Sequence, residues 1–238
     1  MEIEYLSWDT DTFGFKVGNL VSSSFPNSDD LQSVISKAKK AGYKLLYLKD
    51  QDGIDEYLSD SFFLSDEKVI YTKTLGTSFA DGSKEIVSYL HQPLQADLLL
   101  LALQSGGHSR YYMDKKMPIH AYLSLYDAWI KNSLDGSIAS DVLVYQENGT
   151  NIGLLTYKKS TNCVIIGLVA VNYAFRDRGV GSKLIKHLDG LFPEGTVIEV
   201  ATQKANIGAC RFYEKNGFEV KSISNIYHIW VDDYINQL

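Results

Sequence analysis

The sequence has little of what marks exported, membrane-spanning or nucleic-acid-binding proteins. Its 238 residues include only two cysteines, Cys163 and Cys210, which is too few for a disulfide framework. No stretch approaches ~20 uninterrupted apolar residues, and the start at Met1 lacks the basic-then-apolar order of a signal peptide. The net charge of −6 argues against a general nucleic-acid or anionic-membrane surface. We therefore expect a cytoplasmic protein with reduced thiols that binds neither nucleic acid nor a membrane.

The chain divides into two parts around a small, polar stretch. Residues 1–77 are β-rich, with one clear helix that starts near Leu31 and closes at Gly42. Residues 78–84 are expected to form a linker, because small and polar residues dominate there. Residues 85–238 then form a second, larger domain.

The pattern of apolar residues predicts the elements of both parts. In the first part, strands are expected at 44–49, 62–64 and 69–72, the last two on either side of a turn at Ser65-Asp66. The larger domain shows strands at 85–90, 141–146, 151–158, 163–171, 196–202, 218–222 and 226–231, and helices at 94–103, 119–133, 180–192 and 207–215. This order predicts an α+β domain around one sheet.

A glycine-rich segment between the strand at 163–171 and the following helix is the strongest functional signal. It reads Arg176-Asp177-Arg178-Gly179-Val180-Gly181-Ser182-Lys183. Two glycines let the backbone approach a ligand, and the first helical turn exposes unpaired N–H groups at the positive end of the helix dipole. The segment suits a diphosphate, although taken alone it could be only a tight turn. The third glycine of a dinucleotide fingerprint and the spacing of a Walker loop are both absent.

The pattern Arg176-x-x-Gly179-x-Gly181 resembles the Arg/Gln-x-x-Gly-x-Gly/Ala signature of the GCN5-related N-acetyltransferases, the GNAT superfamily. The downstream pattern Asn-x-x-Ala…Phe-Tyr-x-x-x-Gly-Phe also resembles this family, with Asn206 at the start of a helix and Tyr213 late in it. The resemblance covers roughly residues 84–238. It implies a GNAT fold, in which helices flank a mixed, mostly antiparallel twisted sheet.

The GNAT resemblance implies a role for each residue of this region. The ligand would be acyl-CoA, with acetyl-CoA and 3-hydroxybutyryl-CoA both open, and it would act as co-substrate. Backbone groups of 168–171 would pair with the pantetheine arm, those of 178–182 would hold the pyrophosphate, and Tyr213 would protonate the leaving thiolate. An N–H at a strand bulge, at Val169 or a neighbour, would polarise the thioester carbonyl. The implied cofactor-binding residues are Leu168, Val169, Val171, Arg176, Arg178, Gly179, Val180, Gly181, Ser182 and Asn206.

Three further stretches, at 6–15, 109–130 and 199–203, resemble nucleotide-sugar N-acyltransferases of the dTDP-fucosamine acetyltransferase type. This resemblance implies that residues 1–77 are a partial copy of the GNAT fold. The acceptor would be the amine of a dTDP-linked 3- or 4-amino-6-deoxyhexose used for cell-surface polysaccharide, such as the O-antigen of lipopolysaccharide. Arg110, Tyr111 and Tyr112 are the candidate substrate residues. Arg110 could pair with a phosphate of the nucleotide or form a surface salt bridge.

Other functions remain open at this point. A GNAT enzyme could act on a protein N-terminus, a polyamine or an antibiotic, although such members often lack the N-terminal segment. The chain could also be a non-catalytic acyl-CoA-binding module, but the presence of Tyr213, the implied proton donor, favours an enzyme. His187 and His228 have no metal-like neighbours in the sequence, so we predict no metal site. The late strands could pair across a homodimer, but the pattern does not require it.

Overall fold

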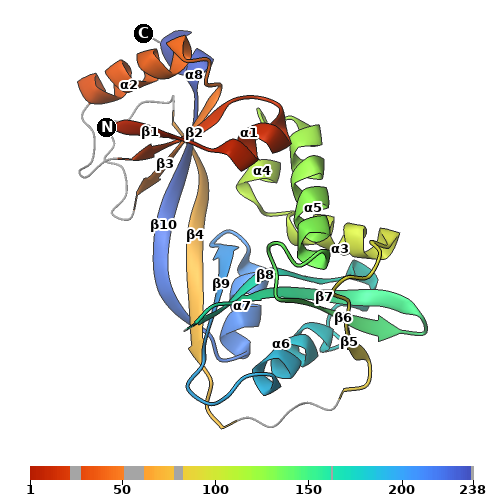
Figure 1. The fold of residues 1–238 in the computed structure, drawn as a ribbon. Helices are drawn as coiled ribbons and strands as arrows, with labels where there is room; N and C mark the ends of the chain where they lie inside the picture. Colours follow the sequence, from red (N-terminus) through yellow and green to blue (C-terminus); the bar gives the residue numbers. More distant parts are fainter. Residues whose placement is uncertain (22–27, 51–61, 78–82, 162, 237–238) are drawn as a thin grey trace. The chain divides into compact units, whose positions relative to one another are not determined.

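The computed structural model describes residues 1–21, 28–50, 62–77, 83–161 and 163–236 (Figure 1). The chain forms two compact units: unit 1 comprises Met1–Lys68, Ser109–Ser124 and Ile223–Leu238, and unit 2 comprises Val69–His108 and Leu125–Ser222. These units differ from the predicted domains 1–77 and 85–238, because two later segments fold with the N-terminal residues. Most of the expected linker, 78–82, lies outside the described residues.

Unit 1 is a small sheet in the order β1-β2-β3-β10-β4. β1 pairs antiparallel with β2, β2 pairs parallel with β3, and β3 pairs antiparallel with the end of β10. The parallel pair is joined through a helix, α2, whose apolar side packs on the sheet around Leu31 and Ile35. Its elements are β1 (Glu2–Tyr5), α1 (Ser7–Phe13), β2 (Val17–Val21), α2 (Ser28–Lys40), β3 (Leu45–Asp50), α4 (Arg110–Met113), α8 (Val231–Asn236), the start of α5 (Ile119–Leu134) and parts of β4 (Phe63–Thr74) and β10 (Glu219–Trp230).

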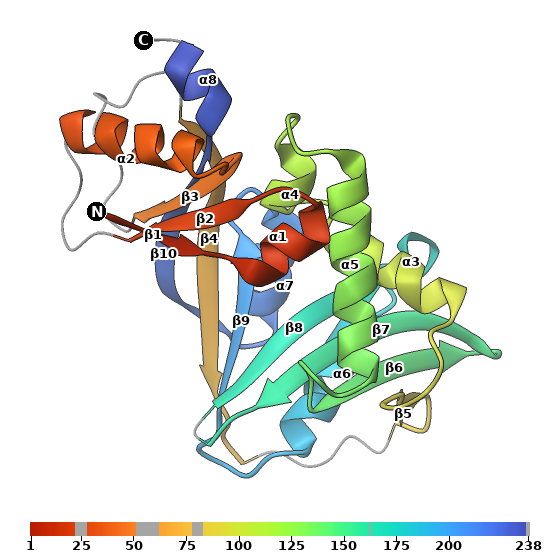
Figure 2. The same cartoon turned by 45° about the horizontal axis from the view of Figure 1, so that its top comes forward.

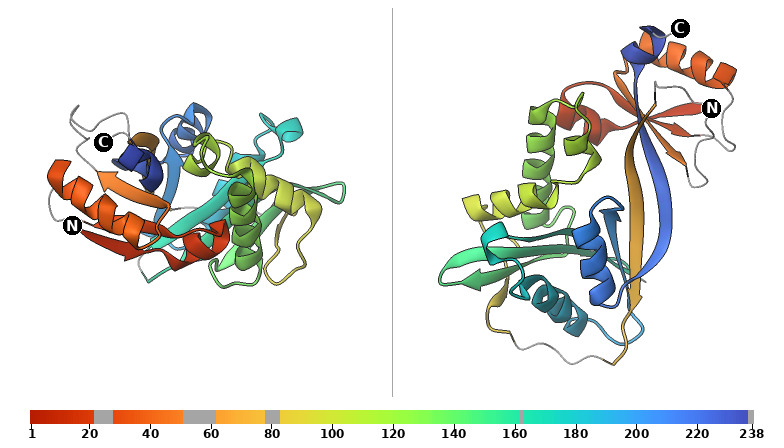
Figure 3. Two further views of the ribbon diagram at one scale, coloured as in Figure 1. Left: turned by 90° about the horizontal axis from the view of Figure 1, so that it is seen from above. Right: turned by 180° about the vertical axis from the view of Figure 1, so that it is seen from behind.

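Unit 2 contains the rest of β4 and continues in the strand order β4-β9-β8-β7-β6-β5. The strands β5 to β8 are antiparallel neighbours, whereas β8 and β9 are parallel. Helices cover both faces of the sheet, with α3 on one and α6 on the other (Figure 3). The elements are β5 (Ile86–Ser88), α3 (Ala96–Ser105), the end of α5 (Ile119–Leu134), β6 (Asp141–Glu147), β7 (Thr150–Lys159), β8 (Cys163–Val171), η1 (Tyr173–Phe175), α6 (Val180–Gly190), β9 (Val197–Gln203) and α7 (Ile207–Lys215).

The predicted α+β class, with a mixed and mostly antiparallel sheet, is confirmed. Two predicted breaks are wrong, because β4 runs unbroken through Ser65-Asp66 and β10 runs unbroken from Glu219 to Trp230. Ser65 is buried, and its hydroxyl donates to the carbonyl of Ile226 at 2.8 Å, so a polar side chain is satisfied inside a strand. Within the described residues, no helix combines the length and the apolar character that crossing a bilayer requires.

Candidate functional site

The parallel strands β8 and β9 of unit 2 are paired over only part of their length. Their pairing runs from Cys163 opposite Val197 to Ile166 opposite Val200. Both strands continue beyond that point without pairing to each other in the described part of the chain, β8 to Val171 and β9 to Gln203. Figure 2 shows the two ribbons drawing apart. We call this unpaired stretch, 167–171 of β8 opposite 201–203 of β9, the strand fork.

A β-bulge marks the start of the fork on the other edge of β8. Leu155 of β7 lies opposite Val169, but Tyr157 lies opposite Ile166, so β8 carries one extra residue between these pairs. The hydroxyl of Thr156 accepts the backbone N–H of Leu168 at 2.9 Å and so satisfies a donor that the bulge takes out of the ladder. Thr156 is 1% exposed, which removes water as an alternative partner.

The bulge decides which backbone groups of β8 face the fork. The N–H groups of Leu168 and Asn172 point toward β7, where they donate to Thr156 Oγ1 and to the carbonyl of Ile152. Because successive residues of a strand alternate between its two edges, the groups of Val169 and Val171 point toward the fork. The backbone N–H of Leu168 is therefore engaged with β7, and an extended ligand in the fork would meet Val169 and Val171.

The fork leads directly to the N-terminus of α6. Asp177 and Gly179 have positive φ values of 60° and 76°, which turn the chain into the helix. The N–H of Lys183 makes the first intrahelical bond, to the carbonyl of Gly179 at 3.0 Å. The N–H groups of Val180, Gly181 and Ser182 precede it and have no acceptor four residues back within the helix. Together with the helix dipole, they form a position suited to an anion.

The two glycines of the loop serve different purposes. Gly179 has a positive φ and open space around it, so its backbone conformation requires glycine. Gly181 is constrained by packing, since a Cβ there would lie 2.9 Å from the Phe212 ring of α7. A larger residue at 181 would therefore displace Phe212, and its effect on ligand binding could not be separated from its effect on packing.

The basic side chains of the loop already have protein partners. Arg178 forms an ion pair with Glu147 at 2.7 Å, and Lys183 Nζ donates to Tyr145 Oη at 3.1 Å. The Arg176 guanidinium lies 3.8 Å from the centre of the Tyr173 ring, and its Nε donates to the carbonyl of Val171 at 3.2 Å. Arg176 thereby occupies one of the acceptors that face the fork.

Asn206 and Tyr213 lie at the two ends of α7. The side-chain oxygen of Asn206 accepts the N–H of Ala209 at 3.2 Å, so this residue caps the helix, and its amide NH₂ is not needed for the cap. Tyr213 is 5% exposed, and its ring lies 5.7 Å from those of Tyr71 and Phe218. Burial raises the pKa of the Tyr213 phenol, and the nearby Cys210 thiol adds to the effect, so the hydroxyl stays protonated at neutral pH.

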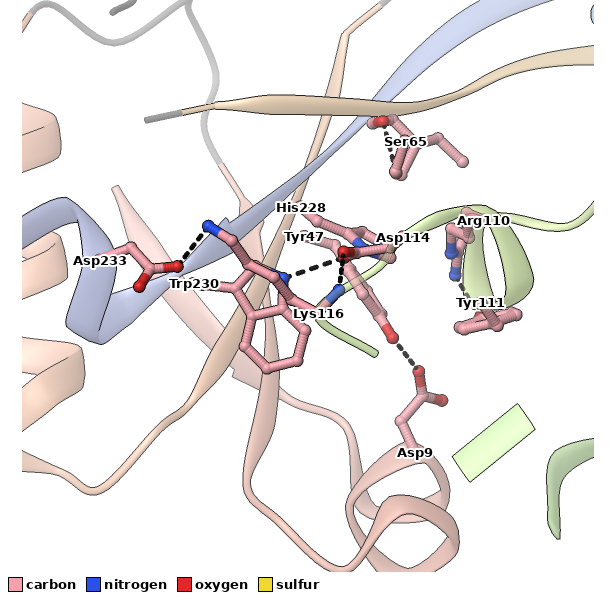
Figure 4. A network of polar contacts seen from close by, with 11 residues as sticks. Asp9, Tyr47, Ser65, Arg110, Tyr111, Asp114, Lys116, His228, Trp230 and Asp233 are labelled. Atoms are coloured by element: carbon pink, nitrogen blue, oxygen red, sulfur yellow. Dashed lines mark hydrogen bonds and ion pairs between the residues drawn. The ribbon is translucent and has the colours of Figure 1, made fainter. Parts of the chain in front are cut away.

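The predicted substrate residues lie in unit 1 and do not share one environment. Arg110 lies between two rings, with its guanidinium 4.6 Å from the centres of both Tyr47 and Tyr111, and it also donates to the Tyr111 hydroxyl (Figure 4). This position differs from a surface salt bridge. Tyr112 is 54% exposed and packs against the Tyr122 ring at 5.1 Å.

A buried carboxylate and imidazole complete the polar cluster of unit 1. Asp114 accepts hydrogen bonds from Trp230 Nε1 at 2.9 Å and pairs with His228 Nδ1 at 2.7 Å (Figure 4). Burial lowers the pKa of His228 more than Asp114 raises it, so the imidazole is neutral and its Nδ1–H donates. No local sequence pattern predicts this pair, because Asp114 and His228 are far apart along the chain.

Comparison with known proteins agrees with the geometry of unit 2. Residues 108–218 match the model of the acetyltransferase (GNAT) family. This part of the chain is therefore similar to the acetyltransferase domain of the GNAT family, and the matched residues include the fork, the loop, Asn206 and Tyr213.

The chain is also similar to one curated protein and to two solved structures. The spore coat polysaccharide biosynthesis protein SpsD of Bacillus subtilis is 30% identical over 132 residues, which are 55% of this chain and 45% of that protein. The chain thus matches less than half the length of this relative. A conserved protein of unknown function from Staphylococcus epidermidis has a TM-score of 0.67 at 13% identity, covering 95% of this chain and 90% of its own. A GCN5-related N-acetyltransferase from Sphaerobacter thermophilus has a TM-score of 0.58 at 13% identity, covering 96% and 76%. These two structures share the fold.

Proposed function

We propose that the chain is an acyl-CoA-dependent N-acyltransferase that binds coenzyme A in the strand fork and at the N-terminus of α6. The observation that carries this proposal is the succession of the two features along the chain. A strand edge whose backbone groups at Val169 and Val171 face the fork, with only the Val171 carbonyl already accepting from Arg176, suits the amides of an extended pantetheine arm. A helix N-terminus follows within ten residues and suits the pyrophosphate. Asn206, at the start of α7, would donate its free amide to the arm.

The proposed reaction is direct transfer of the acyl group to a neutral amine. The amine nitrogen forms a bond to the thioester carbon, the carbon–sulfur bond breaks, and the amine proton is lost to solvent. The N–H of Val169 would donate to the carbonyl oxygen as negative charge develops on it. The Tyr213 hydroxyl would protonate the leaving thiolate, and its raised pKa keeps that proton in place until sulfur carries charge.

The proposed acceptor is the amine of a nucleotide-linked amino-deoxysugar, a dTDP-linked 3- or 4-amino-6-deoxyhexose, on a route to a cell-surface polysaccharide. Two observations support it: the sequence stretches at 6–15, 109–130 and 199–203, and the polysaccharide biosynthesis named for the relative from Bacillus subtilis. We propose that Arg110 binds the nucleotide end, because its Nε is buried and has no hydrogen-bond partner among the residues that the structure describes.

The coenzyme A site is tested by placing one negative charge at the start of α6. In Ser182→Asp, the carboxylate stabilises the helix N-terminus by ~0.3–1 kcal/mol, so the fold should not suffer. It opposes the pyrophosphate by about 2–3 kcal/mol at ~6–8 Å and an effective dielectric near 20, which is about a 30- to 100-fold weaker Kd. Ser182→Asn is the matched control of similar size without charge. The Kd for coenzyme A is measured by calorimetry. Equal Kd values for Ser182→Asp and Ser182→Asn would refute the proposed site.

The acceptor is tested by release of free thiol from acetyl-CoA and 3-hydroxybutyryl-CoA. Each donor is combined with 3-amino and 4-amino dTDP-6-deoxysugars, and in parallel with a peptide N-terminus, a polyamine and an aminoglycoside. We expect release only with a nucleotide sugar, and a higher KM for that sugar in Arg110→Gln. Release with one of the other amines instead would assign that acceptor class. Binding of coenzyme A without release for any acceptor would indicate a non-catalytic module.

A further inference from the structure

The strand fork closes at a defined point, which limits where a bound thioester can go. β9 rejoins β8 at Ile166 opposite Val200, so a chain lying along Val169 and Val171 cannot continue between the strands. Its reacting end must leave the plane of the sheet near residue 167. The side chains of Val164 and Ile166 fill the core on the face that α6 covers. On the opposite face the side chain of Ile165 is 49% exposed, so the acyl group would leave the sheet on that side.

Gly167 lies beside the bulge on the opposite face. A Cβ at this position would lie 2.7 Å from Thr156 Oγ1 and 3.6 Å from the indole nitrogen of Trp129, so the close approach of the Thr156 hydroxyl requires glycine here. A cavity of ≈ 290 Å³ opens there. Its wall includes Trp129, Ile138, Thr156, Ile165 and Gly167.

We infer that this cavity receives the acyl group of the thioester and favours chains of four to six carbons over acetyl. The inference rests on the proposed function and specifies which acyl-CoA donor the strand fork would bind. A carbon of an acyl chain occupies roughly the ~30 Å³ of a water molecule, so a chain of about six carbons fits with space to spare. The side chains of Trp129, Ile138 and Ile165 supply apolar surface for such a chain.

The inference is tested by the affinity for a series of donors without any acceptor. Calorimetry gives Kd for coenzyme A, acetyl-CoA, butyryl-CoA and hexanoyl-CoA on the wild-type chain. Each buried methylene should tighten binding by up to about fourfold, so butyryl-CoA should bind about tenfold more tightly than acetyl-CoA. Ile165→Trp fills the cavity from its 49% exposed wall position and should abolish this preference while leaving the Kd of coenzyme A unchanged.

Val220→Trp is the matched control, because Val220 is 51% exposed on a strand and lies outside the cavity lining. It should keep the wild-type preference. If Ile165→Trp does not fold, Ile138→Trp carries the same test from a second exposed position of the wall. Equal Kd values for acetyl-CoA and hexanoyl-CoA in the wild type, or a preference that survives the filled cavity, would overturn the inference. Both results leave coenzyme A binding intact, whereas failure of the proposed function appears as no binding of any of the four ligands.

Discussion

Thr156 is the residue whose replacement tests the bulge of β8 most directly. In Thr156→Val the shape of the side chain is kept, but the acceptor for the Leu168 N–H is lost. That N–H lies against a side chain that is 1% exposed, so water cannot replace the hydroxyl. An unsatisfied buried donor costs about 1–3 kcal/mol. The free energy of unfolding should therefore fall by this amount, unless β8 shifts its register to pair Leu168 elsewhere.

A register shift would have its own signature, because it would turn the N–H of Val169 away from the fork. The Kd for coenzyme A, which depends mainly on the pyrophosphate, should then change less than tenfold. Turnover should fall by at least tenfold, or ~1.4 kcal/mol of barrier, since the thioester carbonyl loses its donor.

The two measurements are urea unfolding and steady-state turnover on the same preparations. Thr156→Ser keeps the hydroxyl and loses one methyl group, so it should recover most of the turnover while costing up to about 1 kcal/mol of stability. The reasoning would be refuted by a Thr156→Val variant with wild-type stability and turnover. A Thr156→Ser variant as inactive as Thr156→Val would also refute it, because the hydroxyl would then not be the relevant group.

Two further predictions concern ionisable groups. Tyr213→Phe keeps the ring contacts with Phe218 and should lower kcat at least tenfold with the Kd for coenzyme A unchanged; a kcat within about threefold of wild type contradicts the acid role. For His228, which faces Asp114 and Arg110, the folded-state pKa lies below its usual value of ~6.5, so the unfolded chain binds a proton first as the pH falls. Stability should therefore decrease below about pH 6.5, by up to ~1.4 kcal/mol per pH unit, and urea unfolding of His228→Asn should lack this part of the slope.

The parts of the site that the sequence predicts are those encoded by neighbouring residues. The turn into α6 needs positive φ values close together, which Gly179 supplies locally. The start of α7 needs a capping side chain, and Asn206 is placed for it. Both helices therefore begin where the pattern indicated, and their start points are confirmed.

The parts that the sequence does not predict depend on pairing between distant segments. Thr156 becomes an acceptor only because β7 and β8 pair with a bulge, and its own neighbours are ordinary strand residues. Ser65 and Asp66 looked like a turn, because small polar residues usually interrupt strands. They stay within β4, since β10 supplies a buried acceptor for Ser65. The Asp114–His228 pair has the same origin.

The positively charged side chains of the loop are not all free to bind a ligand. Arg178 is held by Glu147, but both partners are partly exposed, and such an ion pair contributes only ~0–1 kcal/mol. A pyrophosphate could therefore draw Arg178 away at little cost. The N–H groups of Val180, Gly181 and Ser182 need no such exchange, because the helix gives them no acceptor. Binding strength in the proposed site should consequently depend more on the helix N-terminus than on the arginines, which is why the decisive charge is placed at Ser182.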